Sequence, residues 1–377
     1  MKILYCLLGT FNSSGMERVV IAKANALARL GHEVIIATTE QHGRADFYAL
    51  GDGVRRVDSD VMYSDSLDLG VVRKFFVRRG KMARHRAFLK GLIEAELPDV
   101  VISTVGNEVG FLPDIAGDAA TVAEIHFSRF YRLQLGRRGV WRWIDRVLTA
   151  MDKRSLRRYD RFVVLTRADA ANWGKMDNLL VIPNFVERMP ERAAALTSGR
   201  TVAVGRLEAQ KDYPAMLRVW RRVVERLPGR VLEIYGEGSE RGRIEDLIRS
   251  YGLEGLVELR GVSEDIDSVY EGASALLHTA AYEGMGMVLI EAMASGVPVV
   301  SFDCPCGPGE IVVDGRTGFL RSPGDEAGLA DDIIRVLEDE KLRHRLGDAS
   351  FTEARRYAPE RVVAMWVREL EELTAGR

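Results

Sequence analysis

Residues 283–302 read EGMGMVLIEAMASGVPVVSF, and they carry the clearest structural signal in the chain. The glycines predict a loop that opens a helix at about Gly286. Gly296 predicts the end of this helix, because glycine adopts the left-handed capping conformation without strain. Residues 297–302 then read as a buried parallel strand, with a proline only near its start. A helix followed at once by a buried strand is typical of an α/β domain.

Two carboxylates lie at the ends of this helical signal. Eight residues of helix rise about 12 Å, so we expect Glu283 at the mouth of a cleft and Glu291 about two turns deeper. Between them, the backbone around Gly286, Met287 and Val288 offers N–H groups at the positive end of a helix. Two hydroxyl acceptors flanking an anion site suit a nucleotide diphosphate sugar, with Glu283 for the sugar and Glu291 for the ribose. The alternative is two carboxylates without a ligand.

Strands and helices alternate along the whole chain, which predicts βαβ units and parallel sheets. In the first half the expected strands are 3–8, 34–38, 100–104, 121–125 and 162–166, with helices that include 17–30 and 82–97. In the second half they are 201–205, 230–235, 257–260, 275–279 and 297–302, with helices at 215–227, 241–251 and 287–294.

A chain of 377 residues is long enough for two domains, each with its own core. We therefore expect an α/β fold of two Rossmann-like parallel-sheet domains that face a cleft. Residues 1–190 would form the acceptor-binding domain and residues 200–355 the nucleotide-sugar domain, with 190–199 as their connection. Residues 356–377 carry one apolar helical stripe and would form a terminal helix.

Two cations follow the strand expected at 201–205. Ligands of open α/β sheets bind beyond the carboxyl ends of the strands, so Arg206 and Lys211 are placed to neutralise a diphosphate. Negative charge grows on a diphosphate as it leaves, and the cations would stabilise this transition state more than the ground state. The alternative is a solvated pair, since Arg and Lys are usually exposed.

Other residues at strand ends are candidates for further contacts. The loop before a helix that starts near Met16 favours an anion close to Gly15, although it lacks the Gly-x-Gly-x-x-Gly pattern of a dinucleotide site. His126 follows the strand at 121–125. Gly236 and Gly238 would let a nucleotide pass close to the backbone. The alternatives are plain turns for the glycines and a hydrogen-bonded structural role for His126.

The two halves of the chain carry opposite net charges. Residues 1–190 carry 29 Lys and Arg against 22 Asp and Glu, whereas the remainder carries 24 against 33. A basic half indicates an anionic partner for the first domain.

The three cysteines do not form a zinc or disulfide pattern, which favours a reducing cytoplasm. No apolar run is long enough to span a membrane.

Residues 73–90 carry eight Lys or Arg and no acidic residue. A second segment, 137–148, interleaves tryptophan and aliphatic residues with arginine. Its members are Arg137, Arg138, Trp141, Arg142, Trp143, Ile144, Arg146, Val147 and Leu148. Basic residues mixed with tryptophan suit an anionic membrane surface. RNA and ordinary solvated helix faces are the alternatives.

Two Asp-x-Asp patterns, Asp58-Ser-Asp60 and Asp265-Ile-Asp267, have the spacing of a known divalent-metal motif. With 55 acidic residues, chance matches are expected. The first lies in a polar loop, and Asp265 suits a helix N-cap. We therefore expect no metal and no resident cofactor.

Together with residues 283–291, five further motifs resemble the retaining glycosyltransferases of family 4, which have the GT-B fold. They are Ser13-Ser-Gly-Met-Glu-Arg18, Ile125-His-Phe-Ser-Arg129, Val181-Ile-Pro-Asn184, Gly205-Arg-Leu-Glu-Ala-Gln-Lys211 and Ser301-Phe-Asp-Cys-Pro-Cys-Gly-Pro-Gly-Glu310. The resemblance covers nearly the whole chain. The last of these motifs is similar to that of enzymes that build bacterial surface polysaccharides and lipid-linked oligosaccharides.

The resemblance implies transfer of a sugar from a nucleotide diphosphate sugar, such as a UDP-sugar, with retention and without metal. It places His126 beside the donor sugar and the backbone at Val262 against the base. It implies a front-face route in which the leaving phosphate takes the acceptor proton. It also implies a terminal helix that crosses back onto the first domain.

The expected partners are the nucleotide sugar, a glycan or polyprenyl-diphosphate-linked acceptor, and the anionic inner leaflet of the cell membrane, with no nucleic acid. The protein would be cytoplasmic and peripheral to that membrane. The alternatives are a nucleotide-sugar epimerase of similar fold and a non-catalytic sugar-nucleotide-binding subunit. A dinucleotide oxidoreductase is disfavoured by the missing glycine fingerprint.

Overall fold

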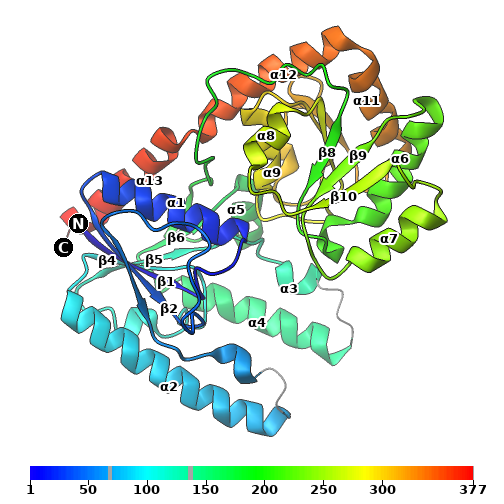
Figure 1. The fold of residues 1–377 in the computed structure, drawn as a ribbon. Helices are drawn as coiled ribbons and strands as arrows, with labels where there is room; N and C mark the ends of the chain where they lie inside the picture. The colour runs from blue at the N-terminus through cyan, green and yellow to red at the C-terminus, as the bar shows by residue number, and fades with distance from the viewer. Residues whose placement is uncertain (67–69, 135–138, 377) are drawn as a thin grey trace. The chain divides into compact units, whose positions relative to one another are not determined.

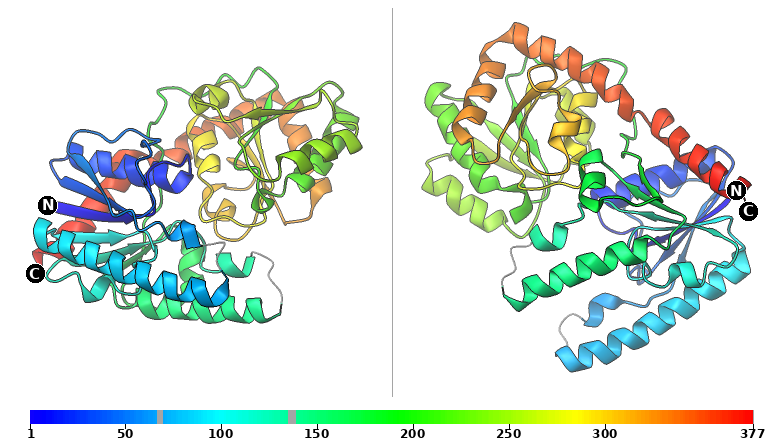
Figure 2. Two further views of the ribbon diagram at one scale, coloured as in Figure 1. Left: turned by 60° about the horizontal axis from the view of Figure 1, so that its bottom comes forward. Right: turned by 180° about the vertical axis from the view of Figure 1, so that it is seen from behind.

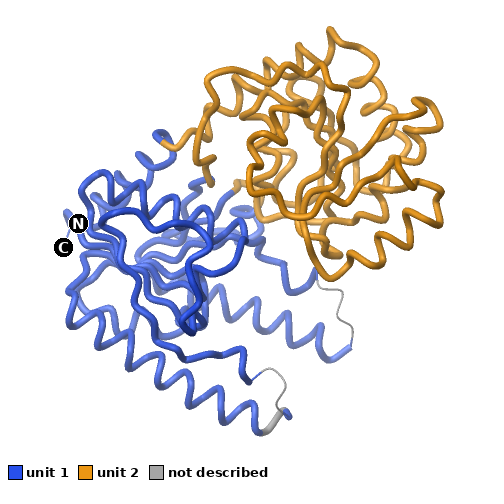
Figure 3. Tube along the Cα trace, in the orientation of Figure 1, with its two compact units in different colours: residues 1–165, 169–183, 360–377 blue, residues 166–168, 184–359 orange. Residues whose placement is uncertain are grey.

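The computed structural model describes residues 1–66, 70–134 and 139–376. The chain forms two compact units. Unit 1 contains residues 1–165, 169–183 and 360–377, and unit 2 contains residues 166–168 and 184–359 (Figure 3). Each unit holds one fully parallel sheet with helices between most of the successive strands (Figures 1 and 2). The prediction of two Rossmann-like α/β domains is confirmed.

The sheet of unit 1 has the strand order β3-β2-β1-β4-β5-β6-β7. Its strands are β1 Lys2–Leu7, β2 Glu33–Thr38, β3 Val54–Asp58, β4 Val100–Ser103, β5 Ala120–Glu124, β6 Arg161–Val164 and β7 Leu179–Val181. Its α-helices are α1 Gly15–Arg29, α2 Val71–Glu96, α3 Tyr131–Gln134, α4 Val140–Leu156, α5 Arg167–Trp173 and α13 Pro359–Ala375. The first two residues of α5 belong to unit 2.

The sheet of unit 2 has the strand order β10-β9-β8-β11-β12-β13. Its strands are β8 Thr201–Val204, β9 Leu232–Tyr235, β10 Val257–Gly261, β11 Ala275–His278, β12 Val299–Phe302 and β13 Gly318–Arg321. Its α-helices are α6 Tyr213–Arg226, α7 Arg241–Ser250, α8 Ile266–Glu271, α9 Met287–Ala294, α10 Pro308–Ile311, α11 Glu326–Glu338 and α12 Glu340–Ala354.

The central strands are apolar because helices cover the sheets. Ile3, Leu4, Val101 and Ile102 of unit 1 are fully buried. In unit 2, α6 packs against α11 and α9 packs against α12. Three strands escaped prediction, namely β3, β7 and β13, and all three lie at sheet edges. β3 carries two arginines, and β7 and β13 are only three and four residues long, so none of them shows the long apolar run of a central parallel strand.

The boundaries between the units differ from the expected ones. The chain enters unit 2 at Asn184, and residues 190–199 belong to that unit rather than to a free connection. There, the Ala194 N–H donates to the Ser295 carbonyl at 2.8 Å, and Leu196 is buried. From Glu360 onward the last helix packs with unit 1, where the Trp366 ring lies 3.7 Å from the Lys23 ammonium.

Candidate active site

The predicted cations and the first carboxylate of unit 2 follow β8 and β11, which are neighbours in the middle of the sheet. The strand order changes direction between these two strands. Open α/β sheets bind ligands at such a switch point, outside the carboxyl ends of the strands. The two loops are tied together, because the Ala281 N–H donates to the Gln210 carbonyl at 2.8 Å and the Thr279 hydroxyl donates to the Lys211 carbonyl at 3.1 Å.

Glu283 is the centre of a buried polar cluster at this position. Its Oε1 lies 2.5 Å from Nζ of Lys211 and 3.0 Å from Nε2 of His278. The Nδ1 atom of His278 lies 2.9 Å from Oγ of Ser301 on the neighbouring strand. In the part of the chain that the structure describes, Oε2 of Glu283 has only a long contact of 3.4 Å from Gln210. The structure therefore joins the predicted cation Lys211 to the predicted carboxylate.

The surroundings of Glu283 fix its charge. Burial alone would raise its pKa, but Lys211 and His278 lower it to about 2, so the carboxylate is ionised at neutral pH. The expected position at the mouth of a cleft is wrong, because the residue is only 6% exposed. The 303–307 segment covers it: the Glu283 N–H donates to the Pro305 carbonyl at 3.3 Å, and the backbone at Gly307 packs against its Cβ.

Arg206 has the opposite environment. Its side chain is exposed and, within residues 1–66, 70–134 and 139–376, makes no hydrogen bond or ion pair. Asp212, which follows Lys211, has a φ of 47° and caps α6 through the Ala215 N–H at 3.2 Å. Left-handed conformations of non-glycine residues are strained and often mark functional loops. Of the two cations in this loop, Lys211 is paired with Glu283, whereas Arg206 is available to a ligand.

Helix α9 spans Met287–Ala294 as predicted. Gly286 precedes it with a φ of 93°, and Gly296 follows it with a φ of 74°, so both positions favour glycine. Met287 and Val288 begin the helix and are half-buried. Their N–H groups belong to the first turn, which lacks intrahelical carbonyl partners and attracts anions.

Glu291 lies in the middle of α9 and is half-buried. Its Oε2 accepts a hydrogen bond of 3.0 Å from the hydroxyl of Tyr270, which is fully buried on α8. Glu291 therefore does not share the cluster of Glu283 among the contacts that the structure records. The two carboxylates are held by different neighbours, which fits two separate roles.

The glycines after β9 have a structural explanation. A Cβ on Gly236 would lie 2.1 Å from the Gly205 carbonyl oxygen, and one on Gly238 would lie 2.3 Å from the Leu207 carbonyl oxygen. The loop after β9 thus packs directly on the loop after β8, and this packing by itself requires glycine at both positions. Val262 follows β10 and is 57% exposed.

Gly15 opens α1 in unit 1, and no atom lies within 4 Å of the position where a Cβ would be. The helix already has internal caps: the Glu17 N–H donates to Ser14 Oγ at 3.4 Å, and the buried Glu17 carboxylate accepts from Asn12 at 2.9 Å and from the Ser14 hydroxyl. A carboxylate therefore already occupies part of the first turn that was predicted to attract a phosphate.

His126 follows β5 in unit 1, so the structure describes it apart from the residues of unit 2. Its Nε2 lies 3.1 Å from Oε1 of Glu124, but neither ring nitrogen makes a hydrogen bond of ordinary geometry in the described part of the chain. Glu124 also lies 2.5 Å from the buried Lys23. Burial alone would raise the pKa of Glu124, but Lys23 and His126 lower it to about 2.

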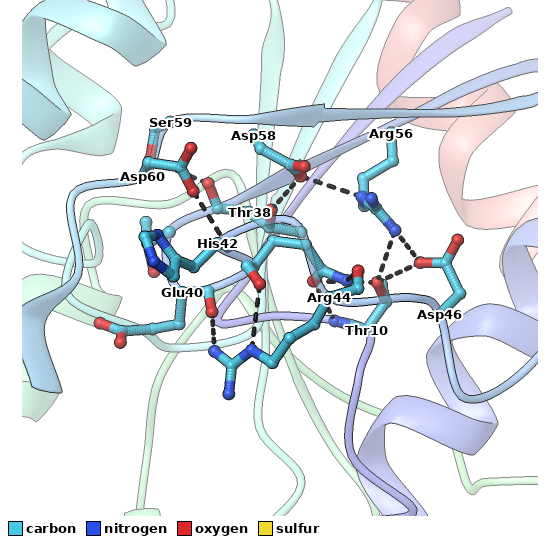
Figure 4. A network of polar contacts seen from close by, with 12 residues as sticks. Thr10, Thr38, Glu40, His42, Arg44, Asp46, Arg56, Asp58, Ser59 and Asp60 are labelled. Atoms are coloured by element: carbon cyan, nitrogen blue, oxygen red, sulfur yellow. Dashed lines mark hydrogen bonds and ion pairs between the residues drawn. The ribbon is translucent and has the colours of Figure 1, made fainter.

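The first Asp-x-Asp segment belongs to a network of loops in unit 1 (Figure 4). Asp58 accepts hydrogen bonds from Thr38 at 2.6 Å and from Arg56 at 2.9 Å, whereas Asp60 accepts from the His42 N–H at 3.0 Å. Asp265 caps α8 by accepting from the Ser268 N–H at 3.1 Å, as predicted. Over the ranges that the structure describes, no group of three or more His, Cys, Asp and Glu side chains could hold a metal ion.

The two basic segments form helices α2 and α4. Phe75 and Phe76 near the start of α2 and Trp141 and Trp143 near the start of α4 are 57–66% exposed. Both helix starts lie at the end of unit 1 that is remote from the chain termini (Figures 1 and 2). Lys81 does not belong to the expected basic surface, since it is buried and bonds to the Met62 carbonyl.

Arg137 and Arg138, which were expected to belong to this basic surface, lie outside the described residues. Four exposed arginines have no ion pair or hydrogen bond elsewhere in the described chain. They are Arg73, Arg79, Arg142 and Arg146. In the ranges that the structure describes, no helix has both the length and the apolar composition needed to cross a membrane.

Sequence reasoning missed His278, Tyr270 and Ser301. His278 lies near the end of the strand predicted at 275–279. This end is at the same edge of the sheet as the predicted site, so its position could have identified it as a candidate. No local signal pointed to Tyr270 or Ser301, because each meets its partner only through the fold.

The fold and this cluster define a two-domain α/β protein with a buried charged cluster at the switch point of its second sheet. Residues 14–184 match the family model described as "Glycosyl transferase 4-like domain", and residues 187–352 match "Glycosyl transferases group 1". The chain therefore belongs to the family 4 type glycosyltransferases, with the GT-B fold. The epimerase and non-catalytic alternatives are not favoured.

Relatives agree with this assignment. An uncharacterized glycosyltransferase of Haemophilus influenzae is 24% identical over 97% of this chain and 98% of its own length. The amylovoran biosynthesis glycosyltransferase AmsD of Erwinia amylovora is 31% identical over 55% of this chain and 61% of its own length. The fold is similar to S. aureus TarM in complex with Fondaparinux, alpha-GlcNAc-glycerol and UDP, with a TM-score of 0.78, 16% identity, and coverage of 98% and 99%.

Proposed function

We propose that this glycosyltransferase moves a hexosyl group, with retention, from a UDP-sugar to a glycan acceptor of the bacterial cell surface. The observation that carries the proposal is the cluster in which Lys211, Glu283 and His278 meet at the switch point of unit 2. The UDP bound by TarM and the amylovoran pathway named for AmsD support the donor and the type of product.

Arg206 and Lys211 would neutralise the diphosphate of the donor. Arg206 is exposed and lacks a protein partner in the described chain, so it can reach a phosphate without breaking another contact. Lys211 would exchange part of its contact with Glu283 for the phosphates. Both cations would act most strongly as the sugar–phosphate bond breaks, because charge then accumulates on the leaving group.

Glu283 would accept a hydroxyl of the transferred sugar, and Glu291 a hydroxyl of the ribose. Gly286, Met287 and Val288 would supply N–H groups to the diphosphate from the start of α9. Gly236, Gly238 and Val262 would lie along the nucleotide. In unit 1, Gly15 and His126 would complete the donor site.

Retention through a covalent intermediate needs a carboxylate nucleophile on the opposite face of the sugar. We propose a front-face route instead, in which the leaving phosphate accepts the proton of the attacking hydroxyl. The protein then holds and neutralises the donor and supplies no general base. The anomeric proton of the product, followed by NMR during the reaction, would report retention or inversion directly.

The donor would be neutralised by side chains and helix N-termini, without a metal ion or resident cofactor. Activity should therefore survive EDTA. Complete loss that Mg²⁺ or Mn²⁺ restores would contradict this part of the proposal and direct attention to the Asp-x-Asp segments.

We further propose that the acceptor is linked to a polyprenyl diphosphate and is met at the cytoplasmic face of the cell membrane. The exposed aromatic side chains and unpaired arginines of α2 and α4 support this, since such mixtures bind anionic interfaces.

The decisive experiment offers the purified protein a panel of UDP-, GDP- and ADP-sugars with lipid-linked and water-soluble glycan acceptors. A new glycosidic linkage from a UDP-hexose is expected. Conversion of the nucleotide sugar to an epimer in the absence of acceptor would instead identify an epimerase.

A further inference from the structure

His278 is a buried titratable residue that the proposed donor contacts do not use. It ends β11 and is paired in the sheet with Ser301 of β12. Both side chains are almost completely buried, at 4% and 0% exposure, and the two ring nitrogens of His278 already face Ser301 and Glu283. The role of His278 must therefore act through its neighbours.

The hydrogen bonds define which ring nitrogen carries the proton. Burial is the main cause that lowers the pKa of His278, so the imidazole is neutral at pH 7 and has one N–H. An ionised carboxylate can only accept, so the proton belongs on Nε2, which faces Oε1 of Glu283 at 3.0 Å. Nδ1 then accepts a hydrogen bond from the Ser301 hydroxyl at 2.9 Å. The Phe302 carbonyl, 2.7 Å from the same hydroxyl, is a second acceptor for this proton.

The two oxygens of Glu283 are unequal. Oε1 receives both Lys211 and His278, whereas Oε2 has only the 3.4 Å contact from Gln210. Oε2 is therefore the oxygen with capacity for a sugar hydroxyl. If Lys211 turns to a diphosphate, Oε1 would keep a single strong donor, namely Nε2 of His278.

We propose that His278 is a positioning residue for the transferred sugar. Its Nε2–H holds Oε1 of Glu283 in place while Lys211 turns to the diphosphate, so that Oε2 stays aimed at a hydroxyl of the sugar. This inference rests on the proposed function, because it assigns the sugar to Glu283 and the diphosphate to Lys211. The ionised Glu283 carboxylate, which can only accept, fixes the tautomer that makes the contact.

The test compares His278→Gln with His278→Met. The two replacements have similar length and volume, but only glutamine keeps an N–H donor near the position of Nε2. The Met variant should lose about 10- to 100-fold in kcat with the UDP-sugar, whereas the Gln variant should stay within about threefold of the wild type. Affinity for free UDP, measured by calorimetry, should be unchanged in both variants, since UDP lacks the transferred sugar.

Two outcomes would overturn the inference. One is equal activity of the Gln and Met variants. The other is an equal loss of UDP affinity and of thermal stability in both, which would make His278 a purely structural residue.

A second measurement does not depend on any donor. Long-range ¹H–¹⁵N spectra of the free protein, with His278 assigned by its absence in the Gln variant, should show the Nε2–H tautomer and a shift of its signal in Glu283→Gln. An Nδ1–H tautomer would refute the inference whatever the enzyme does. If the wild type transfers no sugar but shows the expected tautomer, the proposed function fails and the contact between His278 and Glu283 stands.

Discussion

At the scale of single residues, Arg206 and Lys211 share a loop but not an environment. Arg206 is solvated, while Lys211 is paired with a buried carboxylate. A solvated arginine stabilises the protein only through its interaction with a bound ligand. Lys211 also stabilises the folded protein without a ligand, because Glu283 would otherwise be a buried charge without a cation.

Arg206→Ala should lower turnover by about a hundredfold or more, because it removes a charge-assisted contact that strengthens as the diphosphate leaves. Steady-state kinetics with a saturating donor measure this. Arg222→Ala is the matched control, since Arg222 is an exposed arginine on α6 of the same unit. Near-normal turnover of Arg206→Ala would remove Arg206 from the site.

Lys211→Met should cost at least as much turnover as Arg206→Ala and, unlike it, should also lower the unfolding temperature. The reason is that Glu283 stays buried after its cation is gone. Thermal unfolding of both variants separates the two effects. An unchanged unfolding temperature in Lys211→Met would show that the ion pair with Glu283 is not stabilising.

The two glutamates should separate in calorimetry with free UDP. Glu291→Gln should weaken UDP binding, because its proposed partner is the ribose. Glu283→Gln should leave UDP binding unchanged and reduce sugar transfer, because its proposed partner is the sugar. An equal loss of UDP affinity in both variants would refute this division.

At the scale of secondary structure elements, unit 1 depends on a buried charge that links three of them. Lys23 of α1 pairs with Glu124 at the end of β5 and lies under the Trp366 ring of α13. The last helix therefore packs over an ion pair rather than over a purely apolar surface. Removing one charge leaves the other unpaired in a dry environment.

Lys23→Met should lower the free energy of unfolding by about 3 kcal/mol or more, and Lys23→Met/Glu124→Gln should recover much of the loss. Urea unfolding of the single and double variants decides this. No recovery in the double variant would mean that Lys23 acts mainly through its packing on Trp366.

The pH dependence follows from the depressed pKa of Glu124. Because this pKa falls from the ordinary 4.5 to about 2 on folding, ionised Glu124 stabilises the folded state above pH 4.5. The contribution is lost as the pH falls toward 2. Glu124→Gln should therefore show a smaller loss of stability than the wild type over this range.

At the scale of the whole molecule, charge and exposed aromatic residues are distributed unevenly. The basic excess lies in residues 1–190 and the acidic excess in the remainder. Unit 1 also exposes Phe75, Phe76, Trp141 and Trp143 on two helices. Aromatic residues favour the headgroup level of a bilayer, and each nearby Lys or Arg contributes about 1 kcal/mol on an anionic surface.

The protein should bind anionic but not neutral vesicles, and raised salt should reverse the binding because it screens the charges. Sedimentation with vesicles, together with UDP calorimetry, tests this. Binding should be reduced by replacing four unpaired arginines with glutamine, without a change in UDP affinity. They are Arg73, Arg79, Arg142 and Arg146.

The matched control replaces four exposed arginines of unit 2, namely Arg222, Arg226, Arg249 and Arg345. It should leave vesicle binding intact. Equal binding to neutral vesicles, or none to either kind, would leave α2 and α4 as solvated helices and favour a water-soluble acceptor.

The sequence by itself determined the features that depend on local chemistry. Apolar runs separated by glycine-containing turns predicted two parallel-sheet domains. The glycines on either side of α9 also predicted its observed bounds, Met287–Ala294. The carboxyl-edge rule placed Arg206 and Lys211 just beyond the end of a strand, where ligands of open α/β sheets bind.

Only the tertiary structure decided the partners of these residues. The contacts of His278 with Ser301, of Tyr270 with Glu291 and of Lys23 with Glu124 join residues that are 21 to 101 positions apart. Burial of Glu283, likewise, comes from a segment that follows the next strand. Sequence periodicity reports which face of an element is apolar, whereas hydrogen-bond partners and burial depend on which elements the fold brings together.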